Sequence, residues 1–263
     1  MTAQNAATEA DAGYRIFVRT GCSSCLRTKE FLAERGIAHR VIDVGTDAEG
    51  MSDLLSLGVR HVPILAMGKD YVHAQNLEDV ANFVGIDFGP TNRLAPNVLI
   101  DRWLDILTVG QAYIRQMPQA ALAEKPISGR VGSICDLGYH VFRIGEAYLD
   151  TIDRGVEQWV DNCMQPAPAD TRNGDAVAAY GDRVKEMLRE WWGRQKGHDL
   201  TKETVKTFQG LQSLHWFLER QTWHSAQHVR QLGDILNRQG VKPSPALDSA
   251  MLKDLPLPER IWV

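Results

Sequence analysis

The sequence predicts an α/β domain followed by an all-α domain, and three observations lead to this fold class. The chain has 263 residues, a length that suits two compact domains better than one. Up to residue 86, short β-prone runs alternate with short helical patterns. From residue 98 on, long stretches carry apolar residues at helical spacing.

The α/β domain is expected over residues 13–86. Its strands are predicted at 14–18, 37–44, 61–67 and 71–72, and a tight turn at 68–70 joins the last two. Its helices are predicted at 26–35, 51–57 and 77–84. Gly36 follows the first helix at the position where glycine commonly ends helices. The order β-α-β-α-β-β-α indicates a small α/β sandwich of thioredoxin type.

A linker is expected at residues 87–97, where a glycine and two prolines occur without periodicity. Residues 98–263 are predicted to form the all-α domain. Its four long helical patterns lie at 98–117, 132–159 and 176–192 and within 202–238. Helices of this length indicate a four-helix bundle with a loop-rich tail, a fold in which facing helices commonly build a metal or ligand site.

Composition and charge exclude several classes of partner. The chain has 29 lysines and arginines against 33 acidic residues, a formal charge of −4, so it lacks the basic surplus that nucleic-acid binding requires. No apolar run approaches the roughly 18 residues of a membrane span, and the first residues show no basic cluster followed by an apolar run. We therefore expect a cytoplasmic protein that binds neither nucleic acid nor membranes.

Cys22 and Cys25 form a C-x-x-C pair at the start of the first predicted helix. The unpaired N–H groups and the dipole of a helix N-terminus stabilise a thiolate there. We therefore predict Cys22 as the catalytic nucleophile and Cys25 as the catalytic resolving thiol, which attacks a mixed disulfide on Cys22. Half of a zinc knuckle is the alternative, but it needs a second close pair, and Cys135 and Cys163 are single and distant.

Residues 16–85 resemble a glutaredoxin. The segment V-R-T-G-C-S-S-C matches the active-site loop of that family, with Arg19 three positions before the nucleophile, and Val62-Pro63 matches its cis-proline element. The resemblance implies that Arg19, Val62 and Pro63 bind the thiol substrate, Val62 through backbone hydrogen bonds.

Two segments differ from the glutaredoxin pattern. Ser23-Ser24 stands in place of the usual proline-aromatic pair, and residues 74–76 (A-Q-N) replace the glycine pair that helps to hold glutathione. The cofactor is therefore expected to be glutathione or another low-molecular-weight thiol.

His224 and His228 lie four residues apart in the last predicted helix, so both imidazoles are on one face and can share a metal ion. His140 lies on an apolar stripe of the second bundle helix. A single histidine on an apolar face is more often a packed core residue than a ligand. Three histidines on the core-facing stripes of two helices favour a metal site.

This arrangement resembles the DinB-like family of metal-binding four-helix bundles, which includes thiol-dependent S-transferases. The resemblance covers most of residues 98–238 and implies that His140, His224 and His228 bind a divalent metal with positions open to water or substrate. Zinc, nickel and iron all accept imidazole ligands. The resemblance also implies a homodimer.

The expected function is that of a thiol-dependent enzyme, both an oxidoreductase and an S-transferase. A metal at the three histidines would bind and acidify a thiol or polarise an electrophilic substrate, and Cys22 with Cys25 would reduce the resulting mixed disulfide or conjugate. Its partners are a small-molecule thiol and an electrophilic or disulfide substrate. Two alternatives stay open: a redox- or metal-responsive stress protein without turnover, and a structural bundle used for dimerisation.

Overall fold

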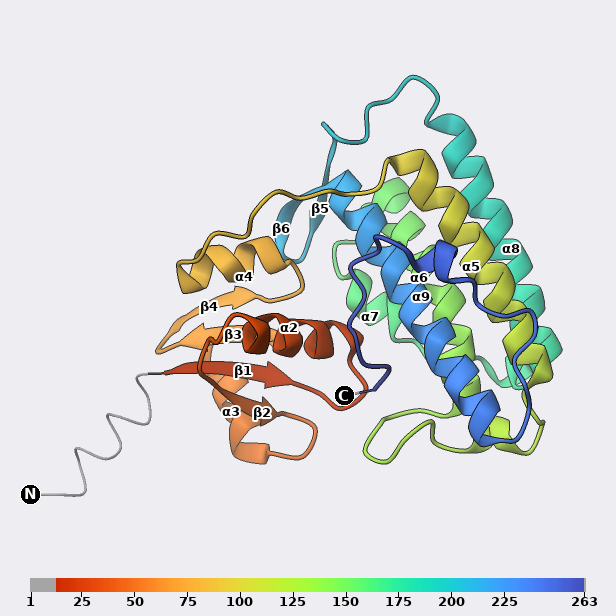
Figure 1. The fold of residues 1–263 in the computed structure, drawn as a ribbon, viewed down its shortest axis with the longest axis horizontal. Helices are drawn as coiled ribbons and strands as arrows, with labels where there is room; N and C mark the ends of the chain where they lie inside the picture. Colours follow the sequence, from red (N-terminus) through yellow and green to blue (C-terminus); the bar gives the residue numbers. More distant parts are fainter. Residues whose placement is uncertain (1–12, 263) are drawn as a thin grey trace, which may run out of the picture. The chain divides into compact units, whose positions relative to one another are not determined.

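The computed structural model describes residues 13–262, which fall into two compact units (Figure 1). The N-terminal unit holds the described residues up to Thr91 and those from Pro258 on, and the helical unit is Asn92–Leu257. The expected all-α domain of 98–263 is therefore too long at its end. The carboxylate of Glu30 accepts hydrogen bonds from the backbone N–H groups of Glu259 and Arg260, at 2.8 and 3.1 Å, and holds these residues in the N-terminal unit.

Four strands form the sheet of the N-terminal unit, in the order β2-β1-β3-β4. Strand β1 (Tyr14–Val18) pairs in parallel with β2 (His39–Asp43) and antiparallel with β3 (Ile64–Met67). Strand β3 pairs antiparallel with β4 (Asp70–His73). This topology confirms the predicted thioredoxin-like arrangement of strands.

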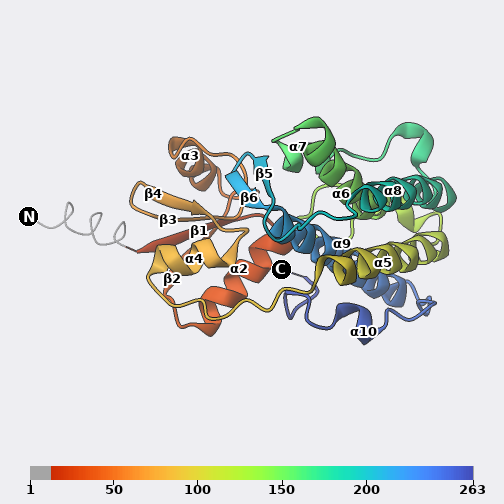
Figure 2. The same ribbon diagram turned by 90° about the horizontal axis from the view of Figure 1, so that it is seen from above.

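Helices cover both faces of this sheet, as Figure 2 shows. They are α2 (Ser23–Glu34), α3 (Ala48–Ser56) and α4 (Leu77–Val84). Alternate residues of β1 enter different cores: Ile16 and Val18 pack with residues of α2 and α4, and Phe17 packs with Leu54 of α3. Because Cys22 is the N-cap, α2 begins at residue 23 rather than at the predicted residue 26.

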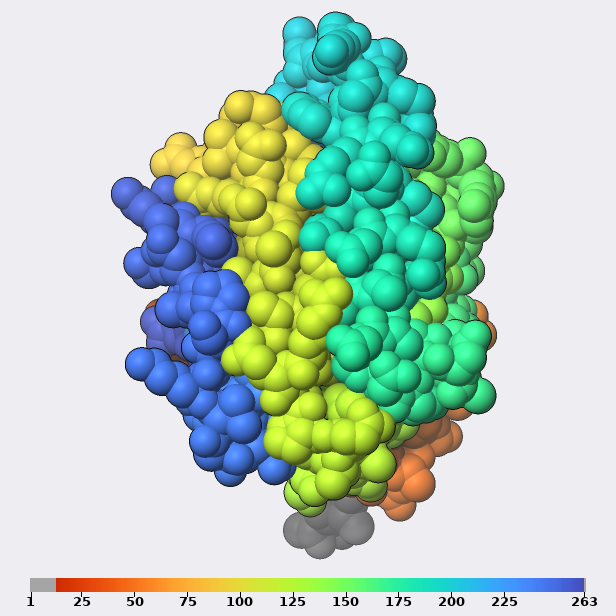
Figure 3. All heavy atoms as spheres, turned by 90° about the vertical axis from the view of Figure 1, so that its right-hand side faces the viewer, coloured from red at the N-terminus to blue at the C-terminus, as the bar shows by residue number. Residues whose placement is uncertain are grey.

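Four long helices dominate the helical unit. They are α5 (Pro96–Gln116), α6 (Ile134–Arg154), α8 (Gly174–Arg194) and α9 (Leu214–Arg238). Helices α5 and α6 each pack against both α8 and α9. Figure 3 shows the face on which α5 and α8 run side by side. The C-terminal part is thus helical, as predicted. No helix among residues 13–262 combines the length and hydrophobicity needed to cross a bilayer.

The predicted helix at 132–159 extends too far at its C-terminal end. Helix α6 ends at Arg154 because Gly155 adopts a left-handed conformation with φ of 69°, which glycine accepts without strain. The chain then changes direction and forms the separate short helix α7 (Trp159–Cys163). This turn brings Cys163 back toward α6.

One other boundary differs from the prediction, and one element was not predicted. Helix α5 begins at Pro96, inside the linker expected at 87–97, because proline is favoured in the first turn of a helix. The segment before α9 is not helical but forms a hairpin of β5 (Thr204–Thr207) and β6 (Gly210–Ser213). The remaining short elements are η1 (Ala121–Ala123), η2 (Ala169–Thr171) and α10 (Ser249–Leu252).

Candidate functional sites

Cys22 and Cys25 lie at the start of α2 and are joined by a disulfide, with their Cα atoms 5.2 Å apart. Cys22 is the N-cap residue, and the backbone N–H of Cys25 donates a hydrogen bond to its Sγ at 3.2 Å. Cys22 is half-buried, whereas Cys25 is fully buried. Attack from solvent therefore reaches Cys22 first, and the helix N-terminus is placed to stabilise its thiolate when the bond is reduced.

The loop between β1 and α2 is held by Asp43 at the end of β2. Its carboxylate accepts hydrogen bonds from the backbone N–H of Thr20 at 3.1 Å and from the Thr20 hydroxyl at 2.6 Å. The carbonyl of Arg19 accepts a hydrogen bond from the N–H of Cys22 at 3.1 Å, while the Arg19 side chain is exposed. Sequence reasoning missed Asp43, although a carboxylate at the end of a strand beside the active loop was a signal for it.

The peptide bond between Val62 and Pro63 is cis, as the resemblance implied. Val62 is half-buried and packs against the same core cluster as Cys22. Residues 74–76, which replace the glycine pair, have structural contacts: Ala74 and Gln75 are buried, and Asn76 caps α4. The roles of Arg19, Val62 and Pro63 in thiol binding remain predictions.

The N-terminal unit is similar in sequence to a known protein family. Residues 15–72 match the family model of glutaredoxin, a stretch that contains both cysteines and the cis proline. The N-terminal unit is a glutaredoxin domain. The chain is also similar to N-acetyl-S-hydroxy-L-cysteine reductase of Bacillus subtilis, with 38% identity over 56 residues. That match covers 20% of this chain and 59% of the length of the Bacillus protein.

The three predicted histidines come together inside the helical unit. His140 projects from α6, and His224 and His228 project from α9. Their ring centroids are 5.2 Å apart for His140 and His224, 4.8 Å for His140 and His228, and 4.7 Å for His224 and His228. All three are buried. We call these three residues the histidine cluster.

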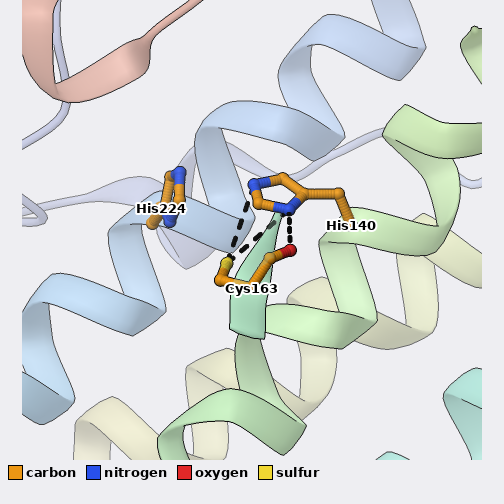
Figure 4. Close-up of side chains that lie close together, drawn as sticks. All are labelled: His140, Cys163 and His224. Carbon is orange, nitrogen blue, oxygen red and sulfur yellow. Dashed lines mark hydrogen bonds between the residues drawn. The ribbon is translucent and has the colours of Figure 1, made fainter. Parts of the chain in front are cut away.

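Cys163 at the end of α7 joins the histidine cluster (Figure 4). Its carbonyl oxygen lies 2.7 Å from Nδ1 of His140, and its Sγ lies 3.9 Å from Nε2 of the same ring. One donor atom from each of His140, Cys163 and His224 can be chosen so that all lie within 4.8 Å of one another. The sequence analysis did not include Cys163 in this site, because the turn at Gly155 that directs α7 onto His140 was not predicted.

Hydrogen bonds orient the three rings. Because a carbonyl oxygen only accepts, Nδ1 of His140 carries the proton and Nε2 keeps its lone pair. Nδ1 of His228 likewise donates to Oε1 of Gln231 at 2.7 Å. In His224 the roles are reversed, since Nδ1 accepts from Nη1 of Arg220 at 2.7 Å and Nε2 donates to Nε2 of His228 at 3.0 Å.

Burial keeps all three imidazoles neutral. Burial, together with the charge of Arg130, lowers the pKa of His140 to about 3. Burial also lowers the pKa values of His224 and His228 well below the usual range, and the nearby guanidinium of Arg220 adds to this for His224. Burial raises the pKa of the Cys163 thiol to about 12. Neutral imidazole is the form that binds metal ions.

Arg220 is a second residue that the sequence analysis missed. Its side chain is 3% exposed, and its guanidinium lies 4.2 Å from the centre of the Trp159 ring on α7. Nη1 also donates to Oε1 of Gln221 at 2.7 Å. Its position one turn before His224 was a usable signal, because residues four apart share a helix face.

The donor set fits a borderline or soft divalent metal. Imidazole nitrogens and a thiol suit zinc, nickel or iron, whereas magnesium and calcium prefer oxygen ligands. His140 and His228 present Nε2 lone pairs, while ligation by Nε2 of His224 requires its proton to move to Nδ1 and Arg220 to release that atom. The site therefore fits a metal after one local rearrangement.

Proposed function

We propose that this protein is a thiol-dependent oxidoreductase whose glutaredoxin domain reduces low-molecular-weight disulfides or sulfenic acids. The observation that carries the proposal is the pair of cysteines at the N-terminus of α2, one half-exposed and one buried behind it. A pair that forms an internal disulfide in this position stores and releases two electrons.

The reaction begins with the reduced pair. The Cys22 thiolate attacks a substrate disulfide R–S–S–R′, forms a bond to one sulfur and releases R′–S⁻, which takes up a proton. The N–H of Cys25 stabilises the attacking sulfur, because it donates to Cys22 Sγ. Cys25 then attacks Cys22 Sγ, releases R–S⁻ and leaves the internal disulfide. Two molecules of glutathione or another small thiol restore the dithiol and become a disulfide.

A sulfenic acid is an equally suitable oxidised substrate. The name of the Bacillus relative gives an S-hydroxy derivative of cysteine as what it reduces. Attack by Cys22 on the sulfur of R–S–OH forms the same mixed disulfide and releases hydroxide, which is protonated to water. Cys25 resolves it as before. This supports a small cysteine derivative as the substrate class.

The histidine cluster supports a second activity, metal-dependent thiol chemistry in a DinB-like bundle. Its support is the convergence of three neutral imidazoles from two helices, with His140 and His228 already oriented by hydrogen bonds. A zinc, nickel or iron ion bound there would lower the pKa of a coordinated thiol and so favour S-transfer to an electrophile. Under this proposal His140, His224 and His228 hold the metal, and the glutaredoxin domain reduces mixed disulfides formed from the same thiol.

One experiment tests both activities. The full chain is assayed for reduction of hydroxyethyl disulfide with glutathione as the electron donor, and its metal content is measured in parallel. We expect Cys22→Ser to abolish reduction and to leave the metal content unchanged, whereas His228→Gln lowers the metal content and leaves reduction unchanged.

Retained reduction by Cys22→Ser would contradict the oxidoreductase. Absence of metal from protein purified without chelator and supplied with zinc, nickel or iron would contradict the second activity. If the cysteine pair cycles between its two redox states but no thiol-dependent turnover occurs, the protein is better described as a redox-responsive stress protein.

A further inference from the structure

We propose that Cys163 is a metal ligand, so that a thiolate completes the site of His140, His224 and His228. This inference rests on the proposed metal binding by the histidine cluster and adds a residue that neither the spacing of the histidines nor the resemblance to the DinB-like family indicated.

The distances suit a shared ion. In a tetrahedral zinc site with Zn–S near 2.3 Å and Zn–N near 2.0 Å, sulfur and nitrogen ligands lie about 3.6 Å apart. Sγ of Cys163 lies 3.9 Å from Nε2 of His140, and the chosen donor atoms of His140, Cys163 and His224 all lie within 4.8 Å. Sγ also lies 3.6 Å from Nδ1 of His140, so the thiol or the ring must rotate to bring Sγ and Nε2 around one centre.

The backbone of Cys163 has a separate role at the same site. Its carbonyl oxygen fixes the proton of His140 on Nδ1, which directs the lone pair of Nε2 away from that carbonyl. The carbonyl group and the thiol of Cys163 therefore both lie close to the imidazole of His140. Trp159, on the same short helix, packs under the guanidinium of Arg220 and helps to seat α7 on α9.

Charge also favours a thiolate here. Nη1 of Arg220 lies 2.7 Å from Nδ1 of His224, and Arg130 also lies near the cluster, so these guanidinium groups repel a bound cation. Three neutral imidazoles do not reduce the charge of a divalent ion. A thiolate from Cys163 reduces it by one and makes binding beside these guanidinium groups less costly.

A thiolate ligand changes how a substrate would bind. Four protein ligands fill the coordination sphere of a tetrahedral ion. A thiol substrate of the proposed transfer reaction would therefore bind by replacing Cys163 or by raising the coordination number.

Cobalt(II) spectroscopy tests this proposal without an activity assay. The full chain carries Cys22→Ser and Cys25→Ser to remove the other reactive thiols, and it is titrated with cobalt(II) after chelator treatment. We expect intense visible d–d bands from the histidine cluster together with a near-ultraviolet thiolate-to-cobalt charge-transfer band. In this background Cys163→Ser should lose the charge-transfer band and keep d–d bands, and circular dichroism should show unchanged helix content.

Cys135→Ser is the matched control, because Cys135 is the other buried free cysteine of the described residues and lies outside the cluster. This variant should keep both sets of bands. Visible d–d bands without a charge-transfer band, or a charge-transfer band that survives Cys163→Ser, would overturn the role of Cys163 and leave metal binding by the histidines intact. Absence of all cobalt bands, in contrast, would overturn the proposed metal site itself and Cys163 with it.

Discussion

Nδ1 of His140 donates a hydrogen bond of 2.7 Å to the carbonyl oxygen of Cys163. The two residues are 23 positions apart, and the hydrogen bond joins the long helix α6 to the short helix α7 that follows it. Both partners are buried. The bond therefore satisfies a buried carbonyl and at the same time selects the tautomer in which Nε2 of His140 keeps its lone pair.

The two cysteines of the glutaredoxin domain should differ in reactivity after reduction. Cys22 is half-buried at the helix N-terminus and Cys25 is fully buried, so brief iodoacetamide treatment near neutral pH should label Cys22 first. Cys25→Ser should also accumulate a mixed disulfide on Cys22 when a disulfide substrate is added, because the resolving thiol is gone. Peptide mass mapping measures both effects. Preferential labelling of Cys25, Cys135 or Cys163 in the reduced wild-type protein would contradict the assignment of the nucleophile.

The buried histidines should make the helical unit unstable in mild acid. An unfolded histidine takes up a proton near pH 6.5, whereas burial lowers the pKa of folded His140 to about 3. Between these values the unfolded state binds more protons, so the free energy of unfolding falls as the pH falls and stays level above pH 6.5. Each such histidine contributes about 1 kcal/mol per pH unit in this window.

Urea unfolding in the presence of a chelator, compared at pH 7 and pH 5, measures this dependence. Tryptophan fluorescence reports on the helical unit, since all of the tryptophans but Trp262 lie within it. His140→Gln should reduce the difference between the two pH values, and the control His39→Gln in the glutaredoxin domain should not. If His140→Gln loses as much stability between pH 7 and pH 5 as the wild-type protein, protonation of His140 does not cause the loss.

The close contact between helices α6 and α8 should not tolerate a side chain at position 181, where α8 has a glycine. A Cβ atom there would lie 2.7 Å from Cε1 and 2.8 Å from Cδ1 of Phe142, which is fully buried. Gly181→Ala should therefore destabilise the protein by about 1–3 kcal/mol. Gly193→Ala on the same helix is the control, because a Cβ atom there meets nothing within 4 Å and alanine should stabilise the helix by about 1 kcal/mol. Thermal unfolding of the two variants would show opposite shifts, and equal shifts would contradict the close packing.

Local patterns were enough to predict the parts of each site that lie within one element. The C-x-x-C pair and the four-residue spacing of His224 and His228 are properties of single helix turns, and both appear in the structure as expected. His140 was found because it lies on the buried stripe of an amphipathic helix. For these residues, the spacing along a single helix is enough to show which side chains lie on the same face.

Residues brought in by a change of chain direction could not be predicted in the same way. Cys163 reaches the histidine cluster only because the chain turns at Gly155, and the helical pattern of the sequence continues through that glycine to Trp159. The β5-β6 hairpin was missed because its connection, Phe208-Gln209, lacks the Asn-Gly or Asp-Gly signal of two-residue turns. The first error concerns a helix that ends at a glycine within an apolar periodic pattern, and the second concerns a turn without a sequence signal.

Arg220 should limit the affinity of the histidine cluster for metal ions. Its Nη1 donates to Nδ1 of His224, and this holds the proton of the neutral ring on Nε2, the atom that faces His228. A glutamine at position 220 offers an amide oxygen that accepts from Nδ1–H instead, as Gln231 does for His228. Arg220→Gln also removes a buried positive charge beside the site.

Both effects act in the same direction, so Arg220→Gln should bind zinc about 10–100-fold more tightly than the wild-type protein, the usual range for residues that orient metal ligands. Competition with a chromophoric chelator measures the affinity. Arg230→Gln, a change of the same chemistry almost three turns further along α9, should leave the zinc affinity nearly unchanged. Weaker zinc binding by Arg220→Gln with unchanged helix content would mean that the guanidinium supports the site, through its contact with Trp159, more than it competes with the metal for His224.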